Sequence, residues 1–209
     1  MATKRMGRPK ADPSRDLRAD LLRIGRALLM EGGPGALSMR EIARRADCTH
    51  QAPYHYFEDR ETLLATLVAM GFDELARRLR AGNDQASGSG VRAALLASGH
   101  AYLDFAMSQP GVFRIMFRPD VCNPTRFAFL QEPAARAHAE LQRLSSIVFG
   151  RRATPALATI LWAHVHGLAC LMVDGPLAMA LTTAAARTAH IHEVGEQFAD
   201  LMMSLVKAK

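Results

Sequence analysis

Apolar residues recur three or four positions apart along nearly the whole chain, as they do on one face of an α-helix. Such stripes run through residues 17–28, 64–79 and 191–205. No segment shows the sustained two-residue alternation that is typical of a half-buried strand. The pattern therefore predicts an all-α protein of about nine helices, in which each apolar stripe packs against a partner.

Glycine and proline divide this pattern into segments. The first helix is expected to end at Gly32, Gly33, Pro34 and Gly35, and the segment GNDQASGSG at 82–90 is expected to follow the fourth helix. Prolines between the later stripes predict helices near 90–108, 110–117, 125–149, 154–173 and 184–206. We expect a flexible basic arm at 1–13, an N-terminal domain of three helices at 14–60, a connecting helix at 61–81, and a C-terminal helical domain at 90–209.

The net charge of +6 lies entirely in the N-terminal part of the chain. Residues 1–45 carry 11 basic and 5 acidic residues, whereas residues 46–209 carry 15 of each. This asymmetry favours a polyanionic partner for the N-terminal part. Cys48, Cys122 and Cys170 lie far apart and form no CxxC pair, and no apolar stretch follows the basic start, so we expect a reduced cytoplasmic setting.

Neither enzyme chemistry nor a membrane span is favoured. The sequence has no GxSxG, no HExxH and no phosphate-binding glycine loop. The apolar stretch 156–173 contains Thr159 and two histidines, which favours a buried interface helix over a membrane span. The pairs His164/His166 and His190/His192 are two residues apart, so on a helix they point to different faces. We expect no cofactor and no metal.

A helix-turn-helix is indicated at residues 38–56. Ser38-Met39-Arg40-Glu41 has the form of a capping box, in which the Ser38 hydroxyl and the Glu41 carboxylate each bind the other residue's backbone amide. After a short helix through Arg45, Thr49 is expected to cap a second helix through Tyr56. This second helix displays His50, Gln51, Tyr54 and His55, which suits an element that enters the major groove of DNA.

The segment SMREIARRADCTHQAPYHYFEDRETLL resembles the DNA-binding motif of the TetR/AcrR family of transcriptional regulators, and the resemblance extends over about residues 14–81. More loosely, YLDFAMSQPGVFRIMF and LWAHVHGLACLMVDG resemble the C-terminal region of relatives with a Trp-His-Gly motif, here Trp162, His166 and Gly167. The resemblance implies a ligand-responsive, DNA-binding regulator.

Carried over by position, the resemblance implies that Arg40 and Gln51 approach bases. It implies phosphate contacts for Thr49, Tyr54, Tyr56 and Arg60, with His50, Ala52 and His55 beside them. Two positions depart from the family pattern: Asp47 replaces the usual turn glycine, which Asp tolerates, and Pro53 removes a backbone amide from the second helix. Lys4, Arg5, Arg8 and Lys10 are expected to form a mobile arm, which either enters a narrow minor groove or stays solvated.

DNA sites that are read by helix-turn-helix motifs are usually two-fold symmetric, so we expect a homodimer. The last two helices of each chain are expected to form the dimer interface, as a four-helix bundle. The expected interface residues are Leu157, Leu161, Leu168, Met172, Val194, Phe198, Leu201 and Leu205. The alternative is that these stripes only complete the core of a monomer.

Aromatic and methionine residues between these regions either fill the core or, as the resemblance implies, line a pocket for a small apolar or aromatic effector. The candidates are His100, Tyr102, Phe105, Phe113, Met116, Phe117, Phe129 and His166. The function predicted from the sequence is a cytoplasmic repressor that an effector releases from its operator by a population shift. The alternatives are a ligand sensor without specific DNA binding and, with less support, an enzyme.

Overall fold

The computed structural model describes residues 16–207, and every regular element in this part of the chain is helical. Nine α-helices are present among the described residues, as the apolar periodicity predicted. They are α1 (Leu17–Ala36), α2 (Met39–Arg45), α3 (Arg60–Gln85), α4 (Val91–Ser108), α5 (Pro110–Met116), α6 (Gln131–Phe149), α7 (Pro155–Val173), α8 (Pro176–Ala180) and α9 (Ala184–Lys207). Short 3-10 helices occupy η1 (Ala52–His55), η2 (Ala128–Leu130) and η3 (Gly150–Arg152). The basic arm, with Lys4, Arg5, Arg8 and Lys10, lies outside the described residues.

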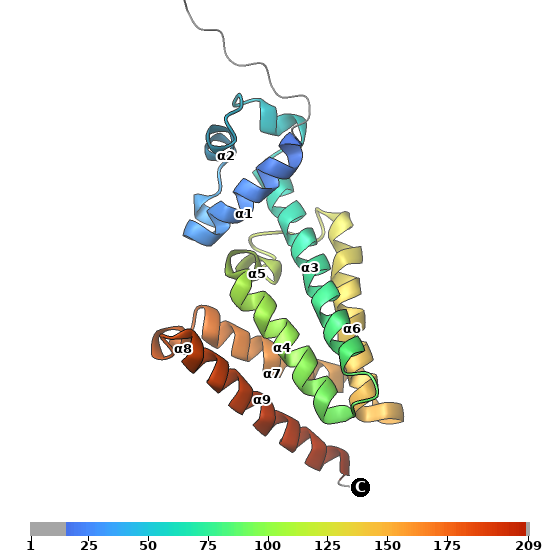
Figure 1. Ribbon diagram of the computed structural model, residues 1–209. Helices are drawn as coiled ribbons and strands as arrows, with labels where there is room; N and C mark the ends of the chain where they lie inside the picture. Colours follow the sequence, from blue (N-terminus) through green and yellow to red (C-terminus); the bar gives the residue numbers. More distant parts are fainter. Residues whose placement is uncertain (1–15, 208–209) are drawn as a thin grey trace, which may run out of the picture.

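The first elements gather around the start of the long helix α3, at one end of the molecule (Figure 1). Leu21 and Leu29 of α1, Ile42 of α2 and Leu63 of α3 are completely buried in the same core. The helical path of α1 breaks at Gly32 and at Gly33, which has a φ of 66°. The predicted stop at these glycines is therefore confirmed, although a last helical turn follows to Ala36.

Helix α3 is longer than the sequence suggested. It continues past Gly82 to Gln85, because Gly82 allows close contact with the backbone of α4: a Cβ there would lie 3.0 Å from the Ala97 carbonyl oxygen. The buried Asn83 amide donates hydrogen bonds to the Glu140 carbonyl and carboxylate of α6, at 3.2 and 3.1 Å. These contacts hold residues that were expected to lie between the helices, so the break spans only residues 86–90.

In the C-terminal body, α4 and α6 pack on the distal half of α3, and α7 and α9 pack on α4 (Figure 1). The observed α4, α5, α7 and α9 agree closely with the predicted ranges, whereas α6 begins at Gln131 rather than near 125. The chain before α6 is instead held by buried Phe127 and by the 3-10 turn η2. The five-residue helix α8 was not predicted.

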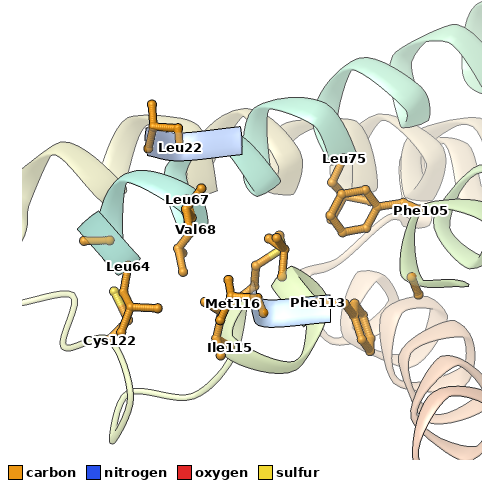
Figure 2. Packing of buried hydrophobic residues seen from close by; sticks show 14 of the residues in the cluster. Leu22, Leu64, Leu67, Val68, Leu75, Phe105, Phe113, Ile115, Met116 and Cys122 are labelled. Carbon is orange, nitrogen blue, oxygen red and sulfur yellow. The ribbon is translucent and has the colours of Figure 1, made fainter. Parts of the chain in front are cut away.

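The short helix α5 lies between the N-terminal elements and the body, where it contacts α1, α3 and α4 (Figure 1). Ile115 and Met116 pack with Leu64 and Val68 of α3 in the continuous core (Figure 2). Two glycines make this packing close. A Cβ at Gly71 of α3 would lie 2.6 Å from the Val112 side chain, and one at Gly111 would lie 2.5 Å from the backbone of Leu29.

Candidate nucleic-acid interface and ligand cavity

The start of α2 is held by a side-chain cap. The Ser38 hydroxyl accepts a hydrogen bond from the Glu41 amide at 3.1 Å, which confirms half of the predicted capping box. The other half is wrong: the Glu41 carboxylate accepts hydrogen bonds from Arg44 and Arg45 instead. These hydrogen bonds lower the pKa of Glu41 to about 2. Arg45 also pairs with Glu31 and so ties α2 to α1.

The turn after α2 depends on Asp47, which adopts a φ of 48°. It is the only residue other than glycine with positive φ among residues 16–207. Asp tolerates the left-handed region better than most residues, so the sequence departure at this position is accommodated. The Cys48 amide then donates to the Ala43 carbonyl at 3.1 Å, which closes the turn.

The second element of the motif is shorter than predicted. In place of a helix over 50–56, the structure has the 3-10 helix η1 at Ala52–His55, with Gln51 rather than Thr49 as its N-cap residue and no side-chain cap bond. Pro53 lacks an amide hydrogen, so it cannot donate within this segment. The Pro53 carbonyl instead accepts from the amides of Tyr56 and Phe57, and both Pro53 and Phe57 are buried.

Seven of the residues predicted to contact DNA are exposed, and Ala52 is half-buried. The exposed ones are Arg40, Thr49, His50, Gln51, Tyr54, His55 and Tyr56. Arg44 and Arg45 are paired with carboxylates, whereas Arg40 forms no ion pair with any residue in the range 16–207. This arrangement leaves the Arg40 guanidinium available to an external partner.

Arg60 has a structural role within the same domain. Its Nε donates to the Leu37 carbonyl at 2.7 Å, and its Nη2 donates to the Pro34 carbonyl. Arg60 thereby satisfies carbonyl groups at the end of α1 and holds α3 against the segment that leads into α2. A phosphate contact through the remaining guanidinium hydrogens stays a prediction.

An apolar cavity of about 320 Å³ lies in the C-terminal body. Its lining comes from α3, α4, α6, α7 and α9 and from Phe117, the residue that follows α5. Of the predicted pocket residues, His100, Tyr102 and Phe117 line this cavity. The cavity is also lined by His138, Trp162 and His164, which were not predicted as pocket residues. The available signal for His164 was its position within an apolar helical stretch.

Five predicted pocket residues do not line this cavity. Phe105, Phe113 and Met116 are buried in the main core (Figure 2). Phe129 lies at the surface with 47% of its area exposed, next to Phe127. His166 contacts Phe113 and Phe117 behind the cavity wall. An aromatic side chain lines a cavity only where helices diverge, and the sequence does not specify that divergence.

His166 belongs to a hydrogen-bonded chain beneath the cavity wall. Its Nδ1 lies 2.8 Å from the Tyr102 hydroxyl, which also accepts from the Trp162 indole at 3.4 Å. Burial lowers the pKa of His166 and raises that of Tyr102, so both are neutral at neutral pH. The other ring nitrogen of His166, Nε2, lies 3.6 Å from the Cys170 sulfur.

The predicted interface residues on α7 and α9 mostly point inward. Leu161, Leu168 and Met172 are buried within the protomer. Val194 is partly buried against the core, Leu157 is half-buried, and Phe198 lines the cavity. Only Leu201 and Leu205 are strongly exposed, at 61% each. A different face of α7, with Ile160 and Leu171, is exposed instead.

Among the described helices, α7 alone has the length and apolar composition of a membrane span. Its mean hydropathy is 1.7, and 28% of the stretch is buried within the protomer. A core helix of a soluble protein meets the same criteria, so this feature is weak support for a membrane role.

These elements define a helix-turn-helix protein with a C-terminal helical domain. The helix-turn-helix consists of the capped α2, the left-handed turn and the exposed η1, and the long helix α3 connects it to the C-terminal bundle. Two family models match the chain: "Bacterial regulatory proteins, tetR family" over residues 21–67 and "Tetracyclin repressor-like, C-terminal domain" over residues 95–194. The chain belongs to the TetR family. Membership of the Trp-His-Gly subgroup stays a prediction.

A similar protein is the HTH-type transcriptional regulator Rv1816 of Mycobacterium tuberculosis, 25% identical over 115 residues. The match covers 55% of this chain and 49% of that relative, about half its length. A protein of unknown function from Rhodococcus sp. RHA1 has a similar structure, with a TM-score of 0.76 and 25% identity, over 93% of this chain and 97% of that one. A tetR-family regulatory protein from Rhodococcus RHA1 shares the fold at a TM-score of 0.68 and 16% identity, over 92% of this chain and 98% of that one.

Proposed function

We propose that the protein is a cytoplasmic, sequence-specific DNA-binding transcriptional regulator, a repressor that a small apolar or aromatic effector releases from a pseudo-palindromic operator. DNA binding is assigned to residues 14–60 with the basic arm, and effector binding and dimerisation to residues 90–209. The observation that carries the proposal is η1, whose exposed polar face is held by buried Pro53 and Phe57. A rigid element that turns polar and aromatic side chains outward suits the major groove.

Sequence-specific DNA binding is tested by selecting bound duplexes from a random pool at about 150 mM salt, because non-specific phosphate binding is weak at that salt concentration. We expect enrichment of a palindrome. Failure to enrich any motif would favour a ligand sensor without specific DNA binding.

Variants then separate the roles of the exposed residues. Gln51→Ala is expected to relax the preference at one base pair, whereas Tyr54→Ala weakens binding to all sequences. Arg40→Ala is compared with Arg77→Ala, which also removes one exposed positive charge, on α3, where Arg77 pairs with Glu74. A similar loss of affinity in both arginine variants would show that net charge, rather than the position of Arg40, controls binding.

The proposed dimer uses an exposed apolar face of α7 and α9, defined by Ile160, Leu171, Leu201 and Leu205. Burial of exposed leucine and isoleucine favours association, and two recognition elements must lie about 34–36 Å apart to match successive major grooves. Leu201→Asp is expected to give a monomer at micromolar concentration, measured by analytical ultracentrifugation. Ile147→Asp on α6 alters an exposed apolar residue outside this face and serves as the matched control. A monomeric wild-type protein would refute the dimer.

The effector is proposed to act by population shift. Occupation of the cavity favours a dimer in which the two η1 elements no longer match successive grooves. The proposal requires that a compound bound in the cavity lowers operator affinity; cavity ligands that leave operator affinity unchanged would contradict it.

A further inference from the structure

In the described part of the chain, the cavity wall has polar side chains but none of the charged ones that a binding site for an ion requires. Among the described residues, no Asp, Glu, Lys or Arg lines the cavity. An ion transferred into such surroundings loses its hydration without gaining an opposite charge. The nearest polar groups are three histidines, Ser98, Tyr102 and Trp162.

Two of these groups are already engaged within the protein. Tyr102 and Trp162 are hydrogen-bonded to one another, and Tyr102 also contacts His166. His164 is stacked parallel on Phe198, with ring centroids 3.6 Å apart, and burial lowers its pKa, so it is neutral. His100 is half-buried, as His164 is, whereas His138 is exposed and contacts the Gln142 amide.

Ser98 is the most buried polar residue of the lining that forms no hydrogen bond among the described residues, and its hydroxyl oxygen is accessible from the cavity. The residue is 5% exposed and lines the cavity, and its hydroxyl forms no hydrogen bond with any residue in the range 16–207. A serine within a helix commonly bonds the carbonyl four positions earlier, and this one does not. A hydroxyl that is accessible from the cavity and has no partner in the protein is available to form a hydrogen bond with a bound molecule.

The neighbouring residue, Gly99, leaves space at the same place. It lines the cavity from the middle of α4, and a Cβ there would meet no atom within 4 Å. Glycine within a helix costs stability relative to alanine, so nothing in the packing of the protomer explains its presence. The cavity has room for about ten water molecules at ~30 Å³ each, the size of a small amphiphile.

We propose that the cavity binds an uncharged amphiphile, an apolar molecule with one hydroxyl or carbonyl head, whose head pairs with the Ser98 hydroxyl and whose body lies along Gly99. This inference rests on the proposed effector site, but it concerns ligand binding alone and is tested without DNA. It makes Ser98 the residue that selects the head group and Gly99 the residue that limits ligand size.

Trp162 provides the measurement, because it is the only tryptophan of the chain and lines the cavity. Its fluorescence is titrated at neutral pH with 1-octanol, octanoate and octylammonium, which share a chain and differ in head-group charge. We expect saturable binding of 1-octanol, at least about tenfold tighter than that of either ion. Equal or tighter binding of an ion, or no saturable binding of 1-octanol, would overturn the proposal.

Two variants localise the ligand. Ser98→Ala is expected to lower the affinity for 1-octanol relative to that for propylbenzene, which has no hydrogen-bonding head, by about fivefold, the effect of one neutral hydrogen bond. Gly99→Phe is expected to abolish binding of both, whereas Gly99→Ala retains it. Circular dichroism checks that each variant is folded. An unchanged affinity ratio in Ser98→Ala would overturn the head-group assignment even if Gly99→Phe failed to fold.

Failure of the proposed ligand class can be distinguished from failure of the proposed effector mechanism. Selective binding of 1-octanol together with unchanged operator affinity would support the ligand class and contradict the effector mechanism. Loss of operator affinity caused by octylammonium rather than 1-octanol would support the mechanism and overturn the ligand class.

Discussion

Replacing Gly111 by alanine is expected to disturb the contact between α5 and α1. The new Cβ would lie 2.5 Å from the Leu29 carbonyl carbon and 2.6 Å from its oxygen, whereas ordinary contacts begin at 3.4 Å. These neighbours are backbone atoms within a helix, so no side chain is able to rotate away. Helix α5 must therefore move from α1 by roughly 1 Å, a displacement that weakens the dispersion contacts along the interface.

The expected size of the effect follows from two opposing contributions. Forcing an extra methyl group into a well-packed contact costs about 1–3 kcal/mol. Alanine recovers up to about 1 kcal/mol through its better helix propensity, because Gly111 has no positive φ that would strain it. We expect a net loss of about 1–2 kcal/mol in the free energy of unfolding, or a drop in Tm of roughly 3–6 °C for a chain of this length.

Urea and thermal unfolding followed by circular dichroism measure this loss, with all variants at the same concentration because a dimer is more stable at higher concentration. Gly99→Ala is the matched control. Its Cβ points into open space, so only the gain in helix propensity of up to about 1 kcal/mol is expected. A Gly111→Ala protein as stable as the wild type would refute the reasoning, since it would show that α5 is not held tightly against α1.

Three further changes have defined expectations. Ser38→Ala removes the cap of α2 and is expected to cost about 1 kcal/mol and to weaken operator binding in mobility-shift assays; unchanged values in both would contradict the role of the cap. Asp47→Gly is expected to raise stability in urea by up to about 1 kcal/mol, because glycine adopts the left-handed φ without strain; a lower midpoint would contradict this. Burial lowers the pKa values of His164 and His166 from 6.5, so the unfolded chain binds more protons below that value. Stability should be complete above pH 6.5 and decrease as the pH falls through the folded-state pKa values, measured as Tm between about pH 8 and 5; a Tm that rises on acidification would contradict it.

Local features of the chain were readable from the sequence because they depend on near neighbours. The cap at Ser38, the left-handed turn at Asp47 and the break at Gly33 each follow from the chemistry of one or two residues. The helices followed from their apolar spacing. The length of η1 was misjudged, because the effect of Pro53 on a helix depends on whether flanking residues such as Phe57 anchor the segment.

The cavity and the outer face of the body were harder to predict because both depend on how helices cross. On α7, the expected interface residues Leu161 and Leu168 turn inward, whereas Ile160 and Leu171 are exposed. Both faces of this helix are apolar, so periodicity does not distinguish a core face from an association face. Ser98 carries no sequence signal either, since a serine within a helix is commonly exposed or bonded to its own backbone.

The packing of α5 gives a physical route between the two sites. Phe117, directly after α5, lines the cavity and contacts both Trp162 and His166. The opposite end of the same helix meets the backbone of α1 at Gly111, where there is no side chain to absorb a displacement. We propose that a ligand which displaces the chain at Phe117 shifts α5 against α1, and that the Glu31–Arg45 ion pair passes this shift to α2. Because the contact at Gly111 is tight, the glycine there belongs to the proposed switch as much as the cavity does.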